Sequence, residues 1–188
     1  MTLPDALLER LLDILKHTTV GPGTDPMTQM GPLVSPQHLE RVLGYVELGL
    51  QEGAVLAHGG RRLGGPLADG LFLEPTIFTA VDNQMRIAQE EIFGPVLAVI
   101  PFRDEQDVVT KANQSRYGLA AGVWTKDIAR GHRLAQSIRA GTIYLNCYNM
   151  FDPCMPWGGF KASGWAREHG SYVLDQYTEV KAVWSSLD

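Results

Sequence analysis

The sequence predicts an α/β protein in which a largely parallel sheet is flanked by helices. Between residues 73 and 146, short runs rich in β-branched and aromatic residues alternate with helical patterns, and connections of this length favour parallel strands. The composition of the 188 residues, 45% hydrophobic and 20% charged, is that of a globular protein with a buried core. At the end of the chain, residues 178–185 alternate polar and apolar side chains and predict one more strand.

The first part of the chain is predicted to form two helices joined by a loop. The first helix opens with the Leu-Pro-Asp of residues 3–5, and its leucines at positions 7, 8, 11, 12 and 15 form one apolar stripe. Residues 21–26 contain two glycines and two prolines, so we expect a loop there. The second helix begins at Ser35 and Pro36, a side-chain cap followed by proline, and stops at Gly53.

Beyond residue 72 the chain is predicted to alternate between strands and helices. Asp104 is expected to cap one of these helices with its side chain. The helices are expected at residues 104–112 and 128–138. The strands are expected at residues 73–78, 96–102, 120–124 and 141–146. The final strand has no hairpin partner in the chain, and because an open strand edge invites pairing, we expect it to pair with another chain.

The composition argues against several classes of protein. The net charge is −5 at pH 7, whereas nucleic-acid binding needs clustered Lys and Arg, so we expect no nucleic-acid partner. No run of about 18 apolar residues is present, which predicts no membrane span, and the acidic residues near the N-terminus do not fit a signal peptide. With only two cysteines and no export signal, we expect reduced thiols and a cytoplasmic location.

Three segments of the chain carry motifs. Residues 89–96 read Gln-Glu-Glu-Ile-Phe-Gly-Pro-Val, and residues 117–125 read Tyr-Gly-Leu-Ala-Ala-Gly-Val-Trp-Thr. Residues 141–146 read Gly-Thr-Ile-Tyr-Leu-Asn and precede a Pro-Trp-Gly-Gly-Phe-Lys turn that begins at Pro156. In this order and spacing, the segments resemble the aldehyde dehydrogenase superfamily, and the resemblance covers essentially the whole chain.

The resemblance implies a fold, a reaction and a division of the chain. Residues 1–175 resemble the part of the aldehyde dehydrogenase catalytic domain that follows its nucleophilic cysteine. Residues 176–188 resemble the strand through which subunits of the family form dimers or tetramers. The implied reaction is the oxidation of an aldehyde to a carboxylate with NAD or NADP as cofactor. We therefore expect a homo-oligomeric oxidoreductase whose partner molecule is an aldehyde substrate.

The same resemblance implies that the 188 residues hold only part of an active site. In the family, the N-terminal NAD-binding domain, the nucleophilic cysteine and the general-base glutamate precede the segment that this chain resembles. No catalytic residue is therefore assigned here, and we expect the chain alone to be inactive. The alternative is a non-catalytic protein that associates with an intact subunit through its last strand.

Two residues of the first motif are candidate cofactor contacts. By resemblance, the carboxylate of Glu91 binds the hydroxyl groups of the ribose next to the nicotinamide, because an ionised carboxylate accepts charge-assisted hydrogen bonds from two hydroxyls. Phe93 is expected to pack near the nicotinamide ring and to help place the carbon that accepts the hydride. Without the resemblance, the two side chains could equally be a solvated glutamate and a core aromatic.

Phe151 and Trp157 are the candidate residues of the substrate pocket, since they match positions that line the aldehyde tunnel in the family. A tryptophan in this turn resembles the betaine and aminoaldehyde dehydrogenases, whose aromatic box holds an ammonium group by cation–π attraction. A flat apolar wall for an aromatic aldehyde, as in phenylacetaldehyde dehydrogenases, is the other interpretation. The residues present leave both open.

The remaining reactive residues are expected to be structural. Neither Cys147 nor Cys154 occupies the nucleophile's place in the family order, and a metal site of these two with His169 lacks the ligand spacing of zinc sites, so no metal is predicted. Ala166 stands where the family usually has glycine. If that position requires a positive φ, alanine costs on the order of 1 kcal/mol and the turn is strained.

Overall fold

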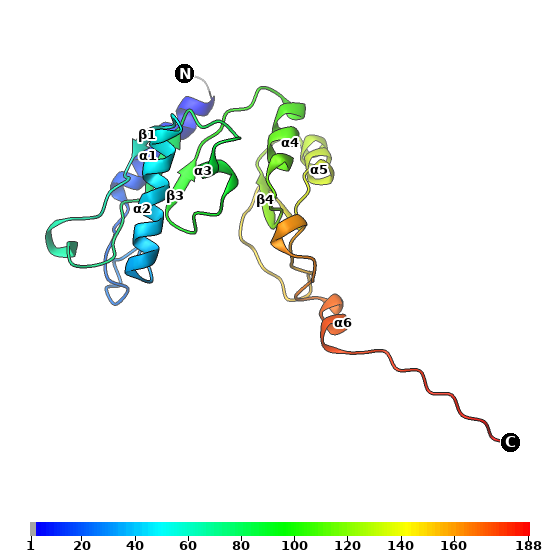
Figure 1. The fold of residues 1–188 in the computed structure, drawn as a ribbon. Helices are drawn as coiled ribbons and strands as arrows, with labels where there is room; N and C mark the ends of the chain where they lie inside the picture. The colour runs from blue at the N-terminus through cyan, green and yellow to red at the C-terminus, as the bar shows by residue number, and fades with distance from the viewer. Residues whose placement is uncertain (1–2) are drawn as a thin grey trace. The chain divides into compact units, whose positions relative to one another are not determined.

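The computed structural model describes residues 3–188 and consists of two compact units, Met1–Phe102 and Arg103–Asp188 (Figure 1). The first unit is called unit 1 below and the second unit 2. Both combine helices with short strands, as the α/β prediction requires. Two of the three strand pairings, β2 with β3 and β4 with β5, are parallel, and β1 pairs with β2 in the antiparallel direction.

Unit 1 contains a three-stranded sheet and two long helices. The helices are α1 (Leu3–His17) and α2 (Pro36–Gln51), with a short α3 (Arg86–Gln89) and a 3-10 turn η1 (Gly65–Leu67). The sheet has the order β1-β2-β3, formed by Val55–His58, Thr76–Thr79 and Val96–Ala98. The two predicted helices and the two predicted strands are confirmed, although both strands are shorter than expected, and β1 and α3 were not predicted.

The core of unit 1 forms where α2 covers the sheet. Leu39, Val42 and Val46, spaced one helical turn apart, are buried together with Phe78 of β2 and Ile92. Burying side chains of this size contributes about 1.5–3 kcal/mol each. Helix α2 begins as predicted, because the Ser35 side chain caps it by accepting a hydrogen bond from a backbone N–H of the first turn. The result is a helix whose position on the sheet is fixed by packing.

Unit 2 is built on a strand–helix–strand unit. Strands β4 (Ala120–Val123) and β5 (Thr142–Leu145) pair in parallel, and α5 (Ile128–Ser137) connects them. Helix α4 (Glu105–Gln114) precedes β4, and its predicted cap is confirmed, because the Asp104 side chain accepts from the Asp107 N–H at 2.8 Å. The four predicted elements of this region therefore exist with small changes at their ends.

The end of the chain carries short turns and then no regular structure. After η2 (Lys161–Ser163), η3 (Ser171–Val173) and α6 (Leu174–Tyr177), residues 178–188 form neither helix nor strand and are exposed (Figure 1). The strand expected at residues 176–188 is thus absent from the single chain, because a strand needs a hydrogen-bonded neighbour. Its pairing with another subunit stays a prediction. Across the described residues, no helix has the length and apolarity that crossing a membrane would need.

Candidate functional site

In unit 1 the candidate site is the segment of residues 90–94, which lies along α2. Ile92 points into the core and is only 8% exposed. Glu90 is held by side chains, since it accepts hydrogen bonds from the Tyr45 hydroxyl at 2.8 Å and from the Arg86 Nε at 2.7 Å. The hydrogen bond and the negative charge of Glu90 raise the pKa of Arg86 above its usual value. The segment is therefore anchored at its first residue and at its centre.

The backbone carbonyls of the two predicted cofactor residues are also held by α2. The Glu91 carbonyl accepts from the Arg41 Nη2 at 2.5 Å, and the Phe93 carbonyl lies 2.6 Å from the His38 Nε2. Gly94 approaches the helix so closely that a Cβ atom there would lie 2.7 Å from a methyl group of Val42. These three contacts hold the segment against one face of α2.

Because α2 binds the backbone of this segment, the side chains of Glu91 and Phe93 point toward solvent. The Glu91 side chain is exposed and the Phe93 ring is 71% exposed. Phe93 also has a φ of 57°, in the left-handed region that non-glycine residues avoid at a cost of about 1–2 kcal/mol. Residues held in such conformations cluster at functional sites. The two residues singled out in the first motif thus lie two positions apart on a rigidly held strip of chain.

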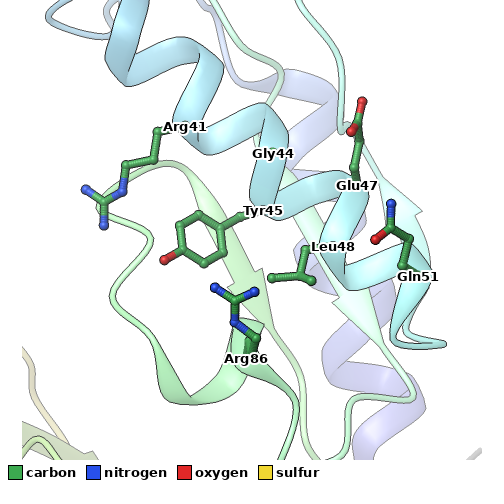
Figure 2. Close-up of a pocket in the computed structure, with 7 residues that line it drawn as sticks. All are labelled: Arg41, Gly44, Tyr45, Glu47, Leu48, Gln51 and Arg86. Atoms are coloured by element: carbon green, nitrogen blue, oxygen red, sulfur yellow. The ribbon is translucent and has the colours of Figure 1, made fainter.

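A hollow lined by α2 and Arg86 lies beside this segment. Figure 2 shows the Tyr45 ring flanked by the guanidinium groups of Arg41 and Arg86, with Leu48 next to them. The Arg41 guanidinium is 5.7 Å from the centre of the Tyr45 ring, a cation–π distance. The hollow measures about 400 Å³ and is open to solvent. Arg41 and Arg86 both hydrogen-bond to the segment of residues 90–94, so the hollow lies on the solvent side of these contacts.

Sequence reasoning missed the residues that position this segment. His38, Arg41 and Tyr45 lie three and four residues apart on α2, so they share one helix face next to the buried stripe. A polar face with this spacing on a capped helix was the available signal. What the sequence could not indicate was the segment that this face would meet, because that segment lies 45 to 55 residues away.

In unit 2 the candidate site is the turn around Trp157. The backbone of Trp157 exchanges two hydrogen bonds of 2.7 Å with that of Glu168, which closes the turn as a small antiparallel ladder. The Phe151 ring packs edge to face on the Trp157 indole, with centroids 5.0 Å apart at 65°. The structure therefore brings the two predicted pocket residues into contact, with an aromatic geometry that stabilises such pairs.

The side chains of Arg167 and Lys161 stabilise this turn through hydrogen bonds to backbone carbonyls. The Arg167 Nη1 donates to the Gly159 carbonyl at 2.9 Å, and its guanidinium lies 5.3 Å from the centre of the Phe160 ring. The Lys161 Nζ donates to the Ser115 carbonyl at 2.7 Å, at the end of α4. Burial, followed by repulsion from Arg139, lowers the pKa of Lys161 below its ordinary value. The Arg167 bond braces the turn internally, and the Lys161 bond ties the turn to the end of α4.

A second hollow of about 370 Å³ opens on this turn. Its lining includes Trp157, Trp165 and Leu119, whereas Phe151 is not among the lining residues. Trp165 is 89% exposed, so the hollow has one free aromatic edge. Large aromatic faces of this kind can bind either an organic cation or another flat apolar group. The geometry therefore suits both substrate interpretations made from the sequence.

The strain expected at Ala166 is not found. Ala166 does not have a positive φ, and the positive φ values of this turn fall on Lys161 (55°), His169 (61°) and the glycines at positions 164 and 170. The chain therefore places its unusual backbone on either side of Ala166. Cys147 is half-buried and Cys154 is exposed, and both are free thiols. Within residues 3–188, no three His, Cys, Asp or Glu side chains gather as a metal site would require.

Comparison with known proteins gives one consistent family. The model of the aldehyde dehydrogenase family matches residues 2–183. A betaine aldehyde dehydrogenase from Brucella anthropi is 47% identical over 187 residues, which are 98% of this chain and 38% of that protein. The chain thus spans a little over a third of the length of such relatives.

Solved structures agree with this match. A mutant of the aldehyde dehydrogenase from Bacillus cereus superposes with a TM-score of 0.92 at 47% identity, over 98% of this chain and 37% of the other. A betaine aldehyde dehydrogenase from Staphylococcus aureus in complex with NAD+ superposes with a TM-score of 0.90 at 42% identity, over 92% and 35%. Similarity at this level extends to the fold of both units.

Proposed function

Because the chain belongs to the aldehyde dehydrogenase family, we propose that it serves the NAD(P)-dependent oxidation of an aldehyde to a carboxylate. The observation that carries this proposal is the outward display of Glu91 and Phe93 from a segment whose backbone is held by α2. An exposed carboxylate and an exposed ring at fixed spacing suit a ribose and a flat heteroaromatic ring. When bound, NAD(P)+ supplies the hydride acceptor.

Each of the two residues has a distinct role in this proposal. The Glu91 carboxylate accepts hydrogen bonds from two ribose hydroxyls, which fixes the sugar. The Phe93 ring packs against the nicotinamide and limits its rotation, so that one face of the ring meets the substrate. Neither residue transfers a proton or forms a covalent bond. Both act by orienting the cofactor.

The role of Glu91 can be tested in a hybrid enzyme, in which residues 1–188 replace the matching segment of the Bacillus cereus aldehyde dehydrogenase. In this hybrid, Glu91→Gln is expected to raise the KM for NAD+ about 10-fold or more, because hydrogen bonds to a charged group contribute about 1.5–3 kcal/mol. Glu40→Gln is the matched control, because Glu40 is also an exposed glutamate but lies on α2. An unchanged KM in Glu91→Gln would refute the ribose contact.

The 188 residues on their own are proposed to be inactive. Neither Cys147 nor Cys154 lies where the family places its nucleophile, and the chemistry requires a thiolate that attacks the aldehyde. The purified chain is expected to produce no NADH above background from propanal or betaine aldehyde with NAD+, measured by absorbance at 340 nm. Turnover above that of a heat-treated sample would overturn this part of the proposal.

The substrate is proposed to be an aldehyde that carries an ammonium group. The similarity to relatives named betaine aldehyde dehydrogenase supports this choice, and the contact between Phe151 and Trp157 supplies an aromatic wall that suits it. In the hybrid, Trp157→Phe is expected to lower kcat/KM for betaine aldehyde by about 2- to 5-fold, because a phenyl ring attracts the ammonium group more weakly than an indole and only part of the cation–π attraction of about 0.5–2 kcal/mol is lost. The value for phenylacetaldehyde should change less. Trp124→Phe is the control, and a larger loss with phenylacetaldehyde would favour the aromatic aldehyde instead.

The tail supports an oligomer and also the second candidate function. Val180, Val183 and Trp184 are more than four-fifths exposed, so residues 178–188 offer an unpaired apolar edge. We propose that this edge pairs with another subunit, either in a homo-oligomer or with an intact enzyme. Deleting residues 178–188 should leave the thermal stability of the chain unchanged and lower its molar mass in light scattering. A mass that stays the same after the deletion would exclude the tail as the pairing element.

A further inference from the structure

We propose that His38 is a positioning residue that holds the Phe93 backbone in its left-handed conformation and thereby sets the direction of the Phe93 ring. The proposal rests on the proposed function, since the ring is assigned there to the nicotinamide. It assigns to His38 no contact with substrate or cofactor. His38 acts only through the peptide group that it binds.

The position of His38 is set by the start of α2. Its backbone N–H donates to the Ser35 Oγ at 3.1 Å, so the residue is fixed by the helix cap. From there its Nε2 reaches the Phe93 carbonyl at 2.6 Å. A carbonyl oxygen can only accept, and therefore Nε2 must carry the proton. The Nδ1 atom is buried and has no hydrogen-bond partner among the described residues, so the ring makes one hydrogen bond, that to the Phe93 carbonyl.

The Phe93 carbonyl depends on that contact, because the other contacts of the segment hold its neighbours and not this group. At a φ of 57° a phenylalanine is disfavoured by about 5- to 30-fold in population relative to ordinary conformations. The ring of Phe93 is 71% exposed and cannot secure the conformation by packing. Within residues 3–188, its one aromatic contact is a tilted one with the His38 ring, at 6.3 Å between centroids.

The flanking residues restrict where the segment runs but not the direction of the Phe93 peptide. Ile92 is buried in the core, and Gly94 lies against Val42. Within residues 3–188, the hydrogen bond to His38 is the one that the peptide group between Phe93 and Gly94 makes. The hydrogen bond from His38 selects one orientation of its carbonyl. Removing that bond should therefore release the conformation of Phe93 while the segment stays on α2.

A spectroscopic experiment on the 188-residue chain tests the inference without catalysis. The chain contains six phenylalanines, and incorporation of 4-fluorophenylalanine gives each a fluorine resonance. The Phe93 resonance is assigned by its disappearance in Phe93→Leu. In His38→Ala it should narrow and move toward the position of the free amino acid, while the other five stay in place. In His38→Gln, whose side-chain amide can donate to the same carbonyl, it should remain near its original position.

A matched control separates positioning from general loss of stability. His58 of β1 also binds a backbone carbonyl, that of Pro75, through its Nδ1 at 2.9 Å. His58→Ala removes the same kind of bond elsewhere in unit 1 and should leave the Phe93 resonance unchanged. A Phe93 resonance unaffected by His38→Ala, or affected equally by His58→Ala, would overturn the inference.

The kinetic experiment shows whether the inference or the proposed function has failed. In the hybrid enzyme, His38→Ala should raise the KM for NAD+ or lower kcat by about 5- to 30-fold, the factor by which the left-handed conformation is disfavoured, and His38→Gln should stay within about 3-fold of the parent. If Phe93→Ala changes neither constant while the fluorine resonance still responds to His38→Ala, then the cofactor role of Phe93 is wrong and the positioning role of His38 stands.

Discussion

Replacing Gly94 by alanine would place a methyl group where α2 already lies. The added Cβ would be 2.7 Å from one methyl carbon of Val42 and 2.9 Å from the other, well inside van der Waals contact. Val42 is fully buried in the core of unit 1, so it has no free volume into which it can move. The backbone of the segment must therefore shift away from the helix, which strains the contacts that hold Phe93.

The size of the effect follows from packing. Overfilling a close-packed core costs roughly 1–3 kcal/mol, and in a unit of this size each kcal/mol lowers Tm by about 4–8 °C. Val42→Ala alone should cost about 1.5–3 kcal/mol through lost burial and a cavity. The double variant should be about as stable as Val42→Ala, because the new methyl group enters the space that the valine vacates. The two changes are then coupled by about 1–3 kcal/mol.

Urea and thermal unfolding of the four proteins measure this coupling. Far-UV circular dichroism follows both units, whereas tryptophan fluorescence follows unit 2 alone, because all four tryptophans lie beyond residue 102. Gly44→Ala is the control, since nothing lies within 4 Å of a Cβ there and alanine should stabilise the helix by up to about 1 kcal/mol. The reasoning is refuted if Gly94→Ala unfolds like the parent, or if its effect simply adds to that of Val42→Ala.

Three further predictions concern unit 2, where tryptophan fluorescence follows unfolding. Ala166→Gly should lower stability by about 0.5–1 kcal/mol, because Ala166 has no positive φ to relieve and glycine only adds freedom to the unfolded chain; a gain in stability would show that the position is strained. The hydrogen bond from the Arg103 backbone N–H and the nearby cations lower the pKa of Asp107. Its contribution to stability is therefore complete above the ordinary carboxylate pKa and is lost as the pH falls through the lowered pKa of Asp107. Asp107→Asn should flatten the acid side of the curve of stability against pH, and an unchanged curve would contradict this. Lys161→Met should cost about 1–3 kcal/mol through the two carbonyls it leaves unpaired, whereas Lys181→Met in the tail should cost nothing measurable; equal effects would argue against the anchoring role.

The sequence predicted those parts of the fold that depend on local signals. Ser35 with Pro36 marks the start of α2, and the Asp104 cap marks the start of α4, because a cap acts within three residues of itself. Strand β1 was missed because Val55–His58 has a single β-branched residue and an alternation too short to distinguish from a loop. The strand expected at residues 176–188 has no hydrogen-bonded neighbour within residues 3–188, and its pairing with another subunit stays a prediction.

The candidate site was predictable to a different degree. Glu91, Phe93, Phe151 and Trp157 could be named through the resemblance to the aldehyde dehydrogenase family, because the motifs that carry it are continuous in the sequence. Their surroundings could not be named, because the residues that hold them come from distant segments. The contact of Phe151 with Trp157 joins two positions of one loop, whereas the grip of His38 on Phe93 spans 55 residues. Only tertiary packing brings such pairs together.

The register of that contact follows from which residues of the segment are buried. Along the segment, the contacts of residues 90, 91 and 93 fall on Tyr45, Arg41 and His38, so the segment runs antiparallel to α2. In this register Ile92 is buried, whereas the side chains of Glu91 and Phe93 on either side of it are exposed. A slip by one residue along α2 would bring Glu91 or Phe93 into the place of Ile92. Because burying an unpaired carboxylate is strongly unfavourable, the burial of Ile92 favours the register that displays both proposed cofactor contacts.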